Sequence, residues 1–142
     1  MQNLENKIIL VTGATDGIGN GLALEMARKG AGVLLHGRDP DRLAKTLADI
    51  KTKTHSDNLE TYVADFSSLE DVRRLAANVT DRHQRVDVLV NNAGIGRGPR
   101  GQQSREISQD NFELRFQVNH LAPFLLTHLL LPLLRDHAPA RI

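Results

Sequence analysis

Three glycines near the amino terminus have the spacing of a turn that can hold a phosphate. The segment 12–19 reads T-G-A-T-D-G-I-G, and it joins a short apolar run to a segment of helical periodicity. Glycines at such a junction permit a tight turn, a close approach of the backbone to a pyrophosphate, and close packing of the helix on a sheet. The helix that follows offers unpaired N–H groups and the positive end of its dipole to the phosphates. The candidate contacts to a dinucleotide in this turn are Gly13, Thr15, Gly17, Ile18 and Gly19.

The residues after the second apolar run indicate which dinucleotide would bind. At this place in a dinucleotide-binding fold, an acid accepts hydrogen bonds from the ribose 2′-OH of NAD, whereas an arginine accommodates the 2′-phosphate of NADP. Asp39 lies 20 residues after Gly19, but because Pro40 follows, Asp39 is instead predicted to be the N-cap of the next helix. Arg38 has a permanent charge on a planar group that suits a phosphate, although an exposed loop arginine is the alternative. We therefore expect NADP(H) in preference to NAD(H).

Short apolar runs alternate with segments of helical periodicity along the whole chain. The runs at 7–12, 33–36, 59–64 and 86–90 are predicted strands. Alternation of this kind is typical of βα units stacked on a parallel sheet. We expect one α/β domain over residues 1–142, a Rossmann-type doubly wound sheet of about four strands in the order 3-2-1-4 with helices on both faces, incomplete at its carboxyl-terminal end.

The same pattern predicts helix ends and buried faces. The apolar residues of the first helix that should face the sheet are Ile18, Leu22 and Met26. The third helix should begin at a capping serine, either Ser67 or Ser68. The last helix is predicted to be long, from about Ser108 to about Arg135, and to be bent or interrupted at Pro123.

Two further motifs accompany the glycine turn. The sequence N-N-A-G occurs at 91–94, directly after the fourth apolar run, and an asparagine-bearing helical segment occurs at 118–127. Together with T-G-x-x-x-G-x-G at 12–19, these motifs make the chain resemble the short-chain dehydrogenase/reductase family from about Asn3 onward, and the last motif resembles retinol-dehydrogenase-like members. The resemblance implies hydride transfer between a nicotinamide and a carbonyl or alcohol carbon of a small molecule. A non-catalytic nucleotide-binding or interaction module is the alternative.

The resemblance also implies roles for individual residues. Asn119 would be the catalytic asparagine, whose helix backbone holds a water of a proton relay; a polar residue that satisfies a helix distortion near Pro123 is the alternative. Asp65 would contact the adenine amino group, or else cap the turn before Ser67. The cofactor contacts implied after the fourth run are Asn91, Asn92, Ala93 and Gly94. Asn91, at the strand tip, also has a structural interpretation.

The family pattern bears on the choice of cofactor in two ways. The acid that binds NAD in relatives would fall at Gly37, so this sequence has no acid there, and Arg38 comes next. Asp16, in contrast, is an acid within the glycine turn, where relatives that prefer NADP often have a base.

The general acid/base of the family is a tyrosine with a lysine four residues later. This chain has one tyrosine, Tyr62, and the residue four positions later is Phe66. Tyr62 belongs to the third predicted strand and is interpreted as a packing residue. In relatives the catalytic serine and the Tyr-x-x-x-Lys pair follow a fifth strand, of which residues 141–142 would be the first. We therefore expect the chain to supply the cofactor-binding half of an oxidoreductase, and we make no claim of activity for the chain alone.

Composition narrows the other possibilities. The chain has 142 residues, 18 Lys and Arg against 17 Asp and Glu, and no Cys or Trp. The length supports a single domain with a core, and the lack of cysteine excludes disulfides and thiolate chemistry. Near-neutral charge with few aromatic residues argues against a nucleic-acid-binding surface. The six histidines lack metal-ligand spacing, so we expect no metal.

Location and assembly are expectations from the same sequence. Residues 1–7 have neither the basic nor the apolar region of a signal peptide, and the longest apolar stretch, 121–134, is expected to be too short to span a membrane. We expect a cytoplasmic protein. The glycine- and arginine-rich loop 96–101 is interpreted as solvated, although its arginines could attract a phosphate. The resemblance implies a homo-oligomer, because in relatives the outer face of the long helix meets a partner subunit.

Overall fold

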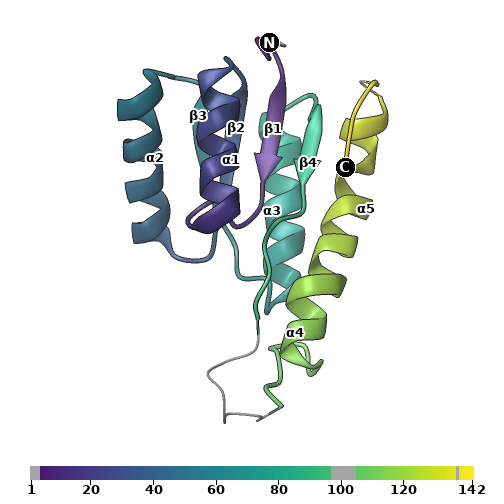
Figure 1. The fold of residues 1–142 in the computed structure, drawn as a ribbon. Helices are drawn as coiled ribbons and strands as arrows, with labels where there is room; N and C mark the ends of the chain where they lie inside the picture. Colours follow the sequence, from purple (N-terminus) through teal and green to yellow (C-terminus); the bar gives the residue numbers. More distant parts are fainter. Residues whose placement is uncertain (1–3, 97–104, 137) are drawn as a thin grey trace.

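Four strands and the helices between them form the part of the chain that the computed structural model describes, residues 4–96, 105–136 and 138–142 (Figure 1). Residues 97–101 of the arginine-rich loop therefore lie outside the described residues. In chain order the elements are β1 (Ile8–Val11), α1 (Gly17–Arg28), β2 (Gly32–Gly37), α2 (Pro40–Thr54), β3 (Leu59–Val63), α3 (Leu69–Arg82), β4 (Val88–Val90), α4 (Leu114–Phe116), the π-helical turn η1 (Gln117–Leu121) and α5 (Ala122–Arg135).

The sheet has the predicted topology. Its strands are parallel and lie in the order β3-β2-β1-β4, with Ile9 of β1 paired to Val33 of β2 and to Val88 of β4. One face is covered by α1 and α2, and the other by α3 and α5 (Figure 1). Leu10 and Leu34 belong to the core on the α3 and α5 face, whereas their strand neighbours pack toward α1 and α2. Burial on both faces explains why β1 and β4, and most of β2, are apolar.

The inward face of α1 differs from the predicted one. The residues of α1 that are buried are Gly19, Ala23 and Ala27. Ile18 is 83% exposed, and Leu22 and Met26 are only half-buried. Met26 does pack against the core on this face. The prediction was wrong for Ile18 and Leu22 because it ranked residues by hydrophobicity, whereas the close approach of α1 to the sheet selects residues by size.

Two helix starts confirm the capping rules. The Asp39 carboxylate accepts hydrogen bonds from the backbone N–H groups of Asp41 and Arg42, at 3.0 and 3.1 Å, and Pro40 is the first residue of α2. Ser68, rather than Ser67, caps α3 by accepting from the N–H of Asp71. Asp39 is therefore occupied as a cap, as expected from the proline beside it.

The last helix is shorter than predicted, and its interruption lies just before Pro123. Ser108 lies in a turn, where its hydroxyl accepts from the N–H groups of Asp110 and Phe112, and helical structure begins at Leu114. The interruption is the π-helical turn η1, which ends just before Pro123. Proline has no N–H group to close the preceding turn, and a widened turn is one way that a helix accommodates this loss.

The helical run Leu114–Arg135 is long and apolar enough to cross a membrane by length and composition. It has 22 residues with a mean hydropathy of 1.2 in its best window, of which 33% is buried. The expectation that this part of the chain is too short was therefore wrong. Core helices of folded domains meet the same criterion, and Leu126, Leu130 and Leu134 of this run are buried in the core beside α3. The expected absence of a membrane span stays a prediction.

Residue 141 continues the sheet. The N–H of Arg141 donates to the carbonyl of Asp87, and the N–H of Leu89 donates to the carbonyl of Arg141, both at 3.0 Å. These bonds make a parallel bridge beside β4. The bridge lies where a fifth strand was predicted to begin, and the strand itself stays a prediction.

Candidate dinucleotide-binding site

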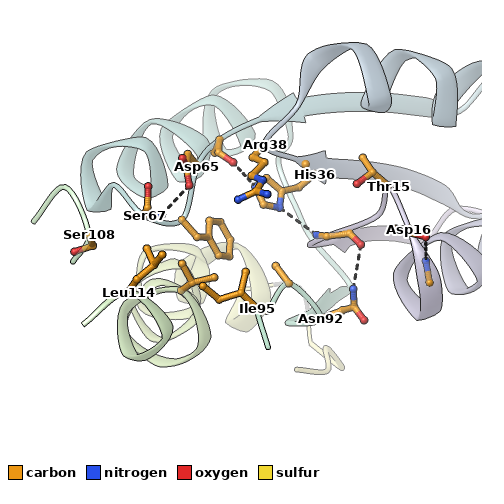
Figure 2. Close-up of a pocket in the computed structure, with 18 of the residues that line it drawn as sticks. Thr15, Asp16, His36, Arg38, Asp65, Ser67, Asn92, Ile95, Ser108 and Leu114 are labelled. Carbon is orange, nitrogen blue, oxygen red and sulfur yellow. Dashed lines mark hydrogen bonds between the residues drawn. The ribbon is translucent and has the colours of Figure 1, made fainter. Parts of the chain in front are cut away.

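A pocket of about 610 Å³ opens where the strands end, and the segment that follows each strand contributes to it. Its walls come from the turn after β1, the residues after β2, β3 and β4, and the segment that leads into α4 and η1. Figure 2 shows Arg38, His36 and Thr15 along one side of it and Leu114 and Ile95 along the other. Because the chain crosses from β3 to β4 over β1, the pocket lies at a topological switch point, where open α/β sheets bind ligands.

The glycine turn adopts backbone angles that favour glycine. Gly13 and Gly17 have φ angles of +66° and +51°, which side-chain-bearing residues rarely adopt. A Cβ atom on Gly13 would lie 2.9 Å from the Cα of Ala93, so only glycine allows these two segments to approach. Of the five residues predicted in this turn, all except Gly19 line the pocket. Gly19 instead lets α1 pack against the turn itself.

Thr12 and Asn92 tie the glycine turn to the loop after β4. The Thr12 hydroxyl donates to the carbonyl of Val90 and accepts from the N–H groups of Asn92 and Ala93, each at 3.0 Å. The Asn92 amide donates to the carbonyls of Thr12 and Gly13, at 2.9 and 3.1 Å. Sequence reasoning missed Thr12, although it is the first residue of the T-G-x-x-x-G-x-G motif. Asn92, Ala93 and Gly94 line the pocket, as the sequence predicts.

Asn91 is not among the residues that line the pocket. Its amide donates to the hydroxyl of Thr127 on α5 at 3.0 Å. This contact agrees with the structural interpretation of Asn91 and gives no support to its assignment as a cofactor contact.

Asn119 holds the loop after β4 from the opposite side. Its amide donates to the carbonyl of Ile95 at 2.9 Å, and its side-chain oxygen accepts from the N–H of Ile95 at 2.8 Å. Ile95 lines the pocket, whereas Asn119 does not. A π-helical turn does surround Asn119, but the side chain bonds to Ile95 and not to the distorted helix, so the structural interpretation is not confirmed either. The catalytic role of Asn119 stays a prediction.

Asp65 has a turn role and also lines the pocket. Its carboxylate accepts from the N–H of Ser67 at 2.9 Å, and its own N–H donates to Asp71 at 3.1 Å. Figure 2 shows Asp65 and Ser67 joined in this way. The structure thus confirms the turn interpretation, while contact with an adenine stays a prediction.

Gly37, which precedes Arg38, lies close to the side chains of Thr15 and Leu43. A Cβ atom on Gly37 would lie 2.7 Å from the Cγ2 of Thr15 and 3.3 Å from the Cδ1 of Leu43. An acid at this place would therefore displace its neighbours. Arg38 is exposed and lines the pocket. Asp16 forms an ion pair with Arg42 at 3.1 Å, so the acid in the glycine turn has a cation beside it.

A buried polar network fixes the wall formed by residues 107–118. Gln117 is fully buried, and its amide donates to the carbonyl of Phe66 at 3.2 Å and to Asp110 at 2.8 Å. The Ser108 hydroxyl donates to the side-chain oxygen of Gln117, and Asp110 also accepts from the N–H of Leu69 at the start of α3. Sequence reasoning missed this network, because nothing local to Gln117 indicates partners 51 residues away.

Tyr62 lies outside the pocket. It is buried in β3, its hydroxyl is 3.1 Å from Glu60 and 2.9 Å from the Nε2 of His83, and burial raises its pKa to about 12. These contacts confirm Tyr62 as a packing residue. Within the described residues, no group of three or more histidine or acidic side chains is placed to hold a metal ion.

The fold and the pocket define a class of domain. A parallel sheet in the order β3-β2-β1-β4, with a glycine turn and a helix amino terminus at its switch point, is a Rossmann-type fold. The sequence profile of the short chain dehydrogenase family matches residues 7–142, and the chain belongs to this family.

Named relatives agree with this membership. Retinol dehydrogenase 13 of Homo sapiens is 40% identical over 139 residues, which are 98% of this chain and 40% of the relative. The complex of Pseudomonas aeruginosa RhlG with NADP is similar with a TM-score of 0.82 and 33% identity, over 99% of this chain and 54% of that chain. A Shigella flexneri short chain dehydrogenase complexed with NADP is similar with a TM-score of 0.81 and 33% identity, over 97% of this chain and 58% of that chain. The chain thus spans about two fifths of its curated relative.

Proposed function

We propose that this chain binds NADP(H) as the cofactor-binding half of an oxidoreductase that interconverts a carbonyl and an alcohol. Membership in the short-chain dehydrogenase family and the NADP complexes of similar structures support a nicotinamide cofactor. The observation that carries the preference for NADP(H) is the pair Gly37 and Arg38. Position 37, where relatives that use NAD have an acid, is a glycine at which a Cβ atom would crowd the Thr15 side chain, and the guanidinium of Arg38 next to it can bind a phosphate.

The chain's own residues would bind and orient the dinucleotide. The amino terminus of α1 faces the pocket and offers a positive dipole end to the pyrophosphate. Arg38 would hold the 2′-phosphate, and Asp65 would accept a hydrogen bond from the adenine amino group. Asn92–Ile95, held by Thr12 on one side and Asn119 on the other, would support the nicotinamide end. NADPH, when bound, supplies the hydride for the carbonyl carbon, and a proton must reach the carbonyl oxygen.

Arg38→Asp is expected to reverse the cofactor preference. Charge-assisted hydrogen bonds contribute about 1.5–3 kcal/mol, so losing the arginine should weaken NADPH binding by roughly 10- to 100-fold. The new acid can accept hydrogen bonds from the ribose hydroxyls of NADH. The measurement is a fluorescence titration with each reduced dinucleotide. Arg73→Asp is the matched control, because Arg73 is exposed on α3 and does not line the pocket. An unchanged ratio of the two dissociation constants would remove Arg38 from this role.

Catalysis is tested separately from binding. The protein encoded by the complete open reading frame should oxidise NADPH when supplied with aldehydes or ketones, and the substrate is to be found from such a panel. Binding of NADPH without any turnover in that protein would favour the non-catalytic nucleotide-binding module.

The homo-oligomer and the cytoplasmic location stay proposals. The outer face of α4, η1 and α5 carries exposed Phe116 and Phe124 with His120 stacked between them, at ring-centroid distances of 5.2 and 6.5 Å. An exposed aromatic row supports a surface for association. Sedimentation over a range of concentrations tests this proposal, and a monomer at all of them would contradict it.

A further inference from the structure

His36 is a buried polar residue of the pocket, and none of the dinucleotide contacts proposed above involves it. It lies near the end of β2, is 3% exposed and lines the pocket beside Gly37. Its Nδ1 atom is 3.3 Å from the backbone nitrogen of Gly13, and its Nε2 atom is 3.1 Å from the carbonyl oxygen of Ala64. Its ring stacks on Phe66 with a centroid distance of 4.5 Å. Figure 2 shows the ring among the strand ends, with dashed lines on both sides.

The two partners select one form of the imidazole. The N–H of Gly13 can only donate, so Nδ1 must be an unprotonated acceptor, and the carbonyl of Ala64 can only accept, so Nε2 must carry the hydrogen. A doubly protonated ring would direct an N–H group at the N–H of Gly13. Burial lowers the pKa of His36 to about 4, against the opposing effects of the Ala64 carbonyl and of Asp65.

A single ring thus connects three segments that form one end of the pocket. His36 binds the glycine turn through Gly13, the end of β3 through Ala64 and Phe66, and it immediately precedes Gly37 and Arg38 in the chain. A backbone hydrogen bond joins the same segments, because the N–H of Ala14 donates to the carbonyl of His36 at 2.8 Å. An apolar side chain of similar size would fill the space but leave a donor and an acceptor without partners.

We propose that His36 is a positioning residue for the adenosine half of the dinucleotide. Its neutral ring fixes the separation between the glycine turn and the end of β3, and so sets the place of the 2′-phosphate and adenine contacts at Arg38 and Asp65. This inference rests on the proposed function, because it assumes that the pocket takes an adenosine phosphate.

Three variants separate the two hydrogen bonds. His36→Asn places an amide near Nδ1 and can keep the bond to Gly13, His36→Gln places an amide near Nε2 and can keep the bond to Ala64, and His36→Leu keeps neither. The probe is 2′,5′-ADP, which carries the adenine and the 2′-phosphate without a nicotinamide. We expect His36→Leu to weaken its binding at least tenfold, and each amide variant to recover part of the loss. Calorimetric titration of the complete chain, with the thermal midpoint recorded for each variant, is the measurement.

His83→Leu is the matched control. His83 is also a largely buried histidine with a hydrogen-bond partner, Tyr62, but it lines a second pocket at the opposite end of the sheet, where the strands begin. We expect this variant to lose stability and to keep the affinity for 2′,5′-ADP. If His36→Leu lowers only the thermal midpoint and binds the probe as the unchanged protein does, His36 has a general packing role and the inference is overturned.

Nitrogen NMR of the imidazole tests the proposal without a ligand or a variant. The expected spectrum has an unprotonated Nδ1 and a protonated Nε2 in His36 at neutral pH, with the Gly13 amide protected from exchange. The opposite tautomer would overturn the inference while the proposed function stands. If the unchanged chain has the expected tautomer but binds neither 2′,5′-ADP nor NADPH, the proposed function fails and the positioning role falls with it.

Discussion

Gly19→Ala is expected to lower the free energy of unfolding by about 3 kcal/mol and to abolish NADPH binding. A Cβ atom at this position would lie 2.3 Å from the carbonyl oxygen of Gly13 and 2.4 Å from the amide nitrogen of Asn92. Neither neighbour is the free end of a flexible chain: the first is backbone, and the second is held by two hydrogen bonds. Helix α1 must therefore move away from the turn, and the phosphate-binding geometry is lost with it.

Gly21→Ala is the control for this prediction. Gly21 lies in the same helix, but a Cβ atom there would have no heavy atom within 4 Å. Alanine in place of glycine in a helix should raise stability by about 0.5–1 kcal/mol and leave binding unchanged. Urea denaturation and an NADPH titration measure both effects. Equal stability and equal affinity of the two variants would show that α1 tolerates a side chain at Gly19, against the packing described above.

Local rules predicted the parts of the fold that depend on neighbours in the chain. Asp39 before Pro40 predicted a helix start because a short acceptor side chain can bind the first free N–H groups, and the proline has none to lose. The alternation of apolar runs with helices predicted a parallel sheet covered by helices, and the strand order followed from the doubly wound fold that the glycine turn indicates. The motif T-G-x-x-x-G-x-G located the turn, since its glycines adopt backbone angles that other residues avoid.

Long-range packing explains what the sequence did not predict. Ile18 is more apolar than Gly19, yet it faces solvent, because the distance between α1 and the sheet is set by contacts that the helix sequence does not contain. His36 in an apolar strand has the pattern of an ordinary core residue, and its partners Gly13 and Ala64 are distant in sequence. Gln117 likewise has a partner that is distant in sequence, since its amide donates to the carbonyl of Phe66.

The family pattern predicted which residues lie at or beside the pocket better than it predicted what their side chains contact. Arg38 and Asn92–Gly94 line the pocket as expected. Gly19 lies next to the pocket because it leaves the space in which α1 packs against the turn. Asn91 and Asn119 lie next to the pocket and bind neighbouring residues instead, because a side chain at a strand tip or on a helix can point in either direction. The motif alone does not contain that direction, which depends on partners such as Thr127 and Ile95.

The free energy of unfolding is expected to fall by about 3 kcal/mol as the pH is lowered from 6.5 to 4. In the unfolded chain His36 titrates near its ordinary value of 6.5, whereas in the folded protein burial lowers its pKa to about 4. Between these two values the unfolded state binds a proton that the folded state does not bind. Stability from His36 is therefore complete above pH 6.5 and decreases toward pH 4.

Acidic groups are expected to affect stability mainly below this pH range. Burial by itself would raise the pKa of Asp87, but the N–H of Ile8 and the charges of Lys7 and Arg85 lower it below its ordinary value of 3.8. The stability from Asp87 is consequently retained at pH 4 and is lost only as the pH falls further, so its contribution is separated from that of His36.

His36→Asn identifies the source of the loss between pH 6.5 and 4. Asparagine does not titrate, so the slope of stability against pH should be flatter in this variant over that range, even though the variant is less stable at pH 7. His83→Asn, which removes a histidine bound to Tyr62 rather than to the glycine turn, should keep the steep slope. Urea denaturation at half-unit steps of pH gives both slopes. A variant at His36 with the full slope of the unchanged protein would show that the ring is not held neutral between Gly13 and Ala64, because only a group whose pKa differs between the folded and unfolded states can contribute to that slope.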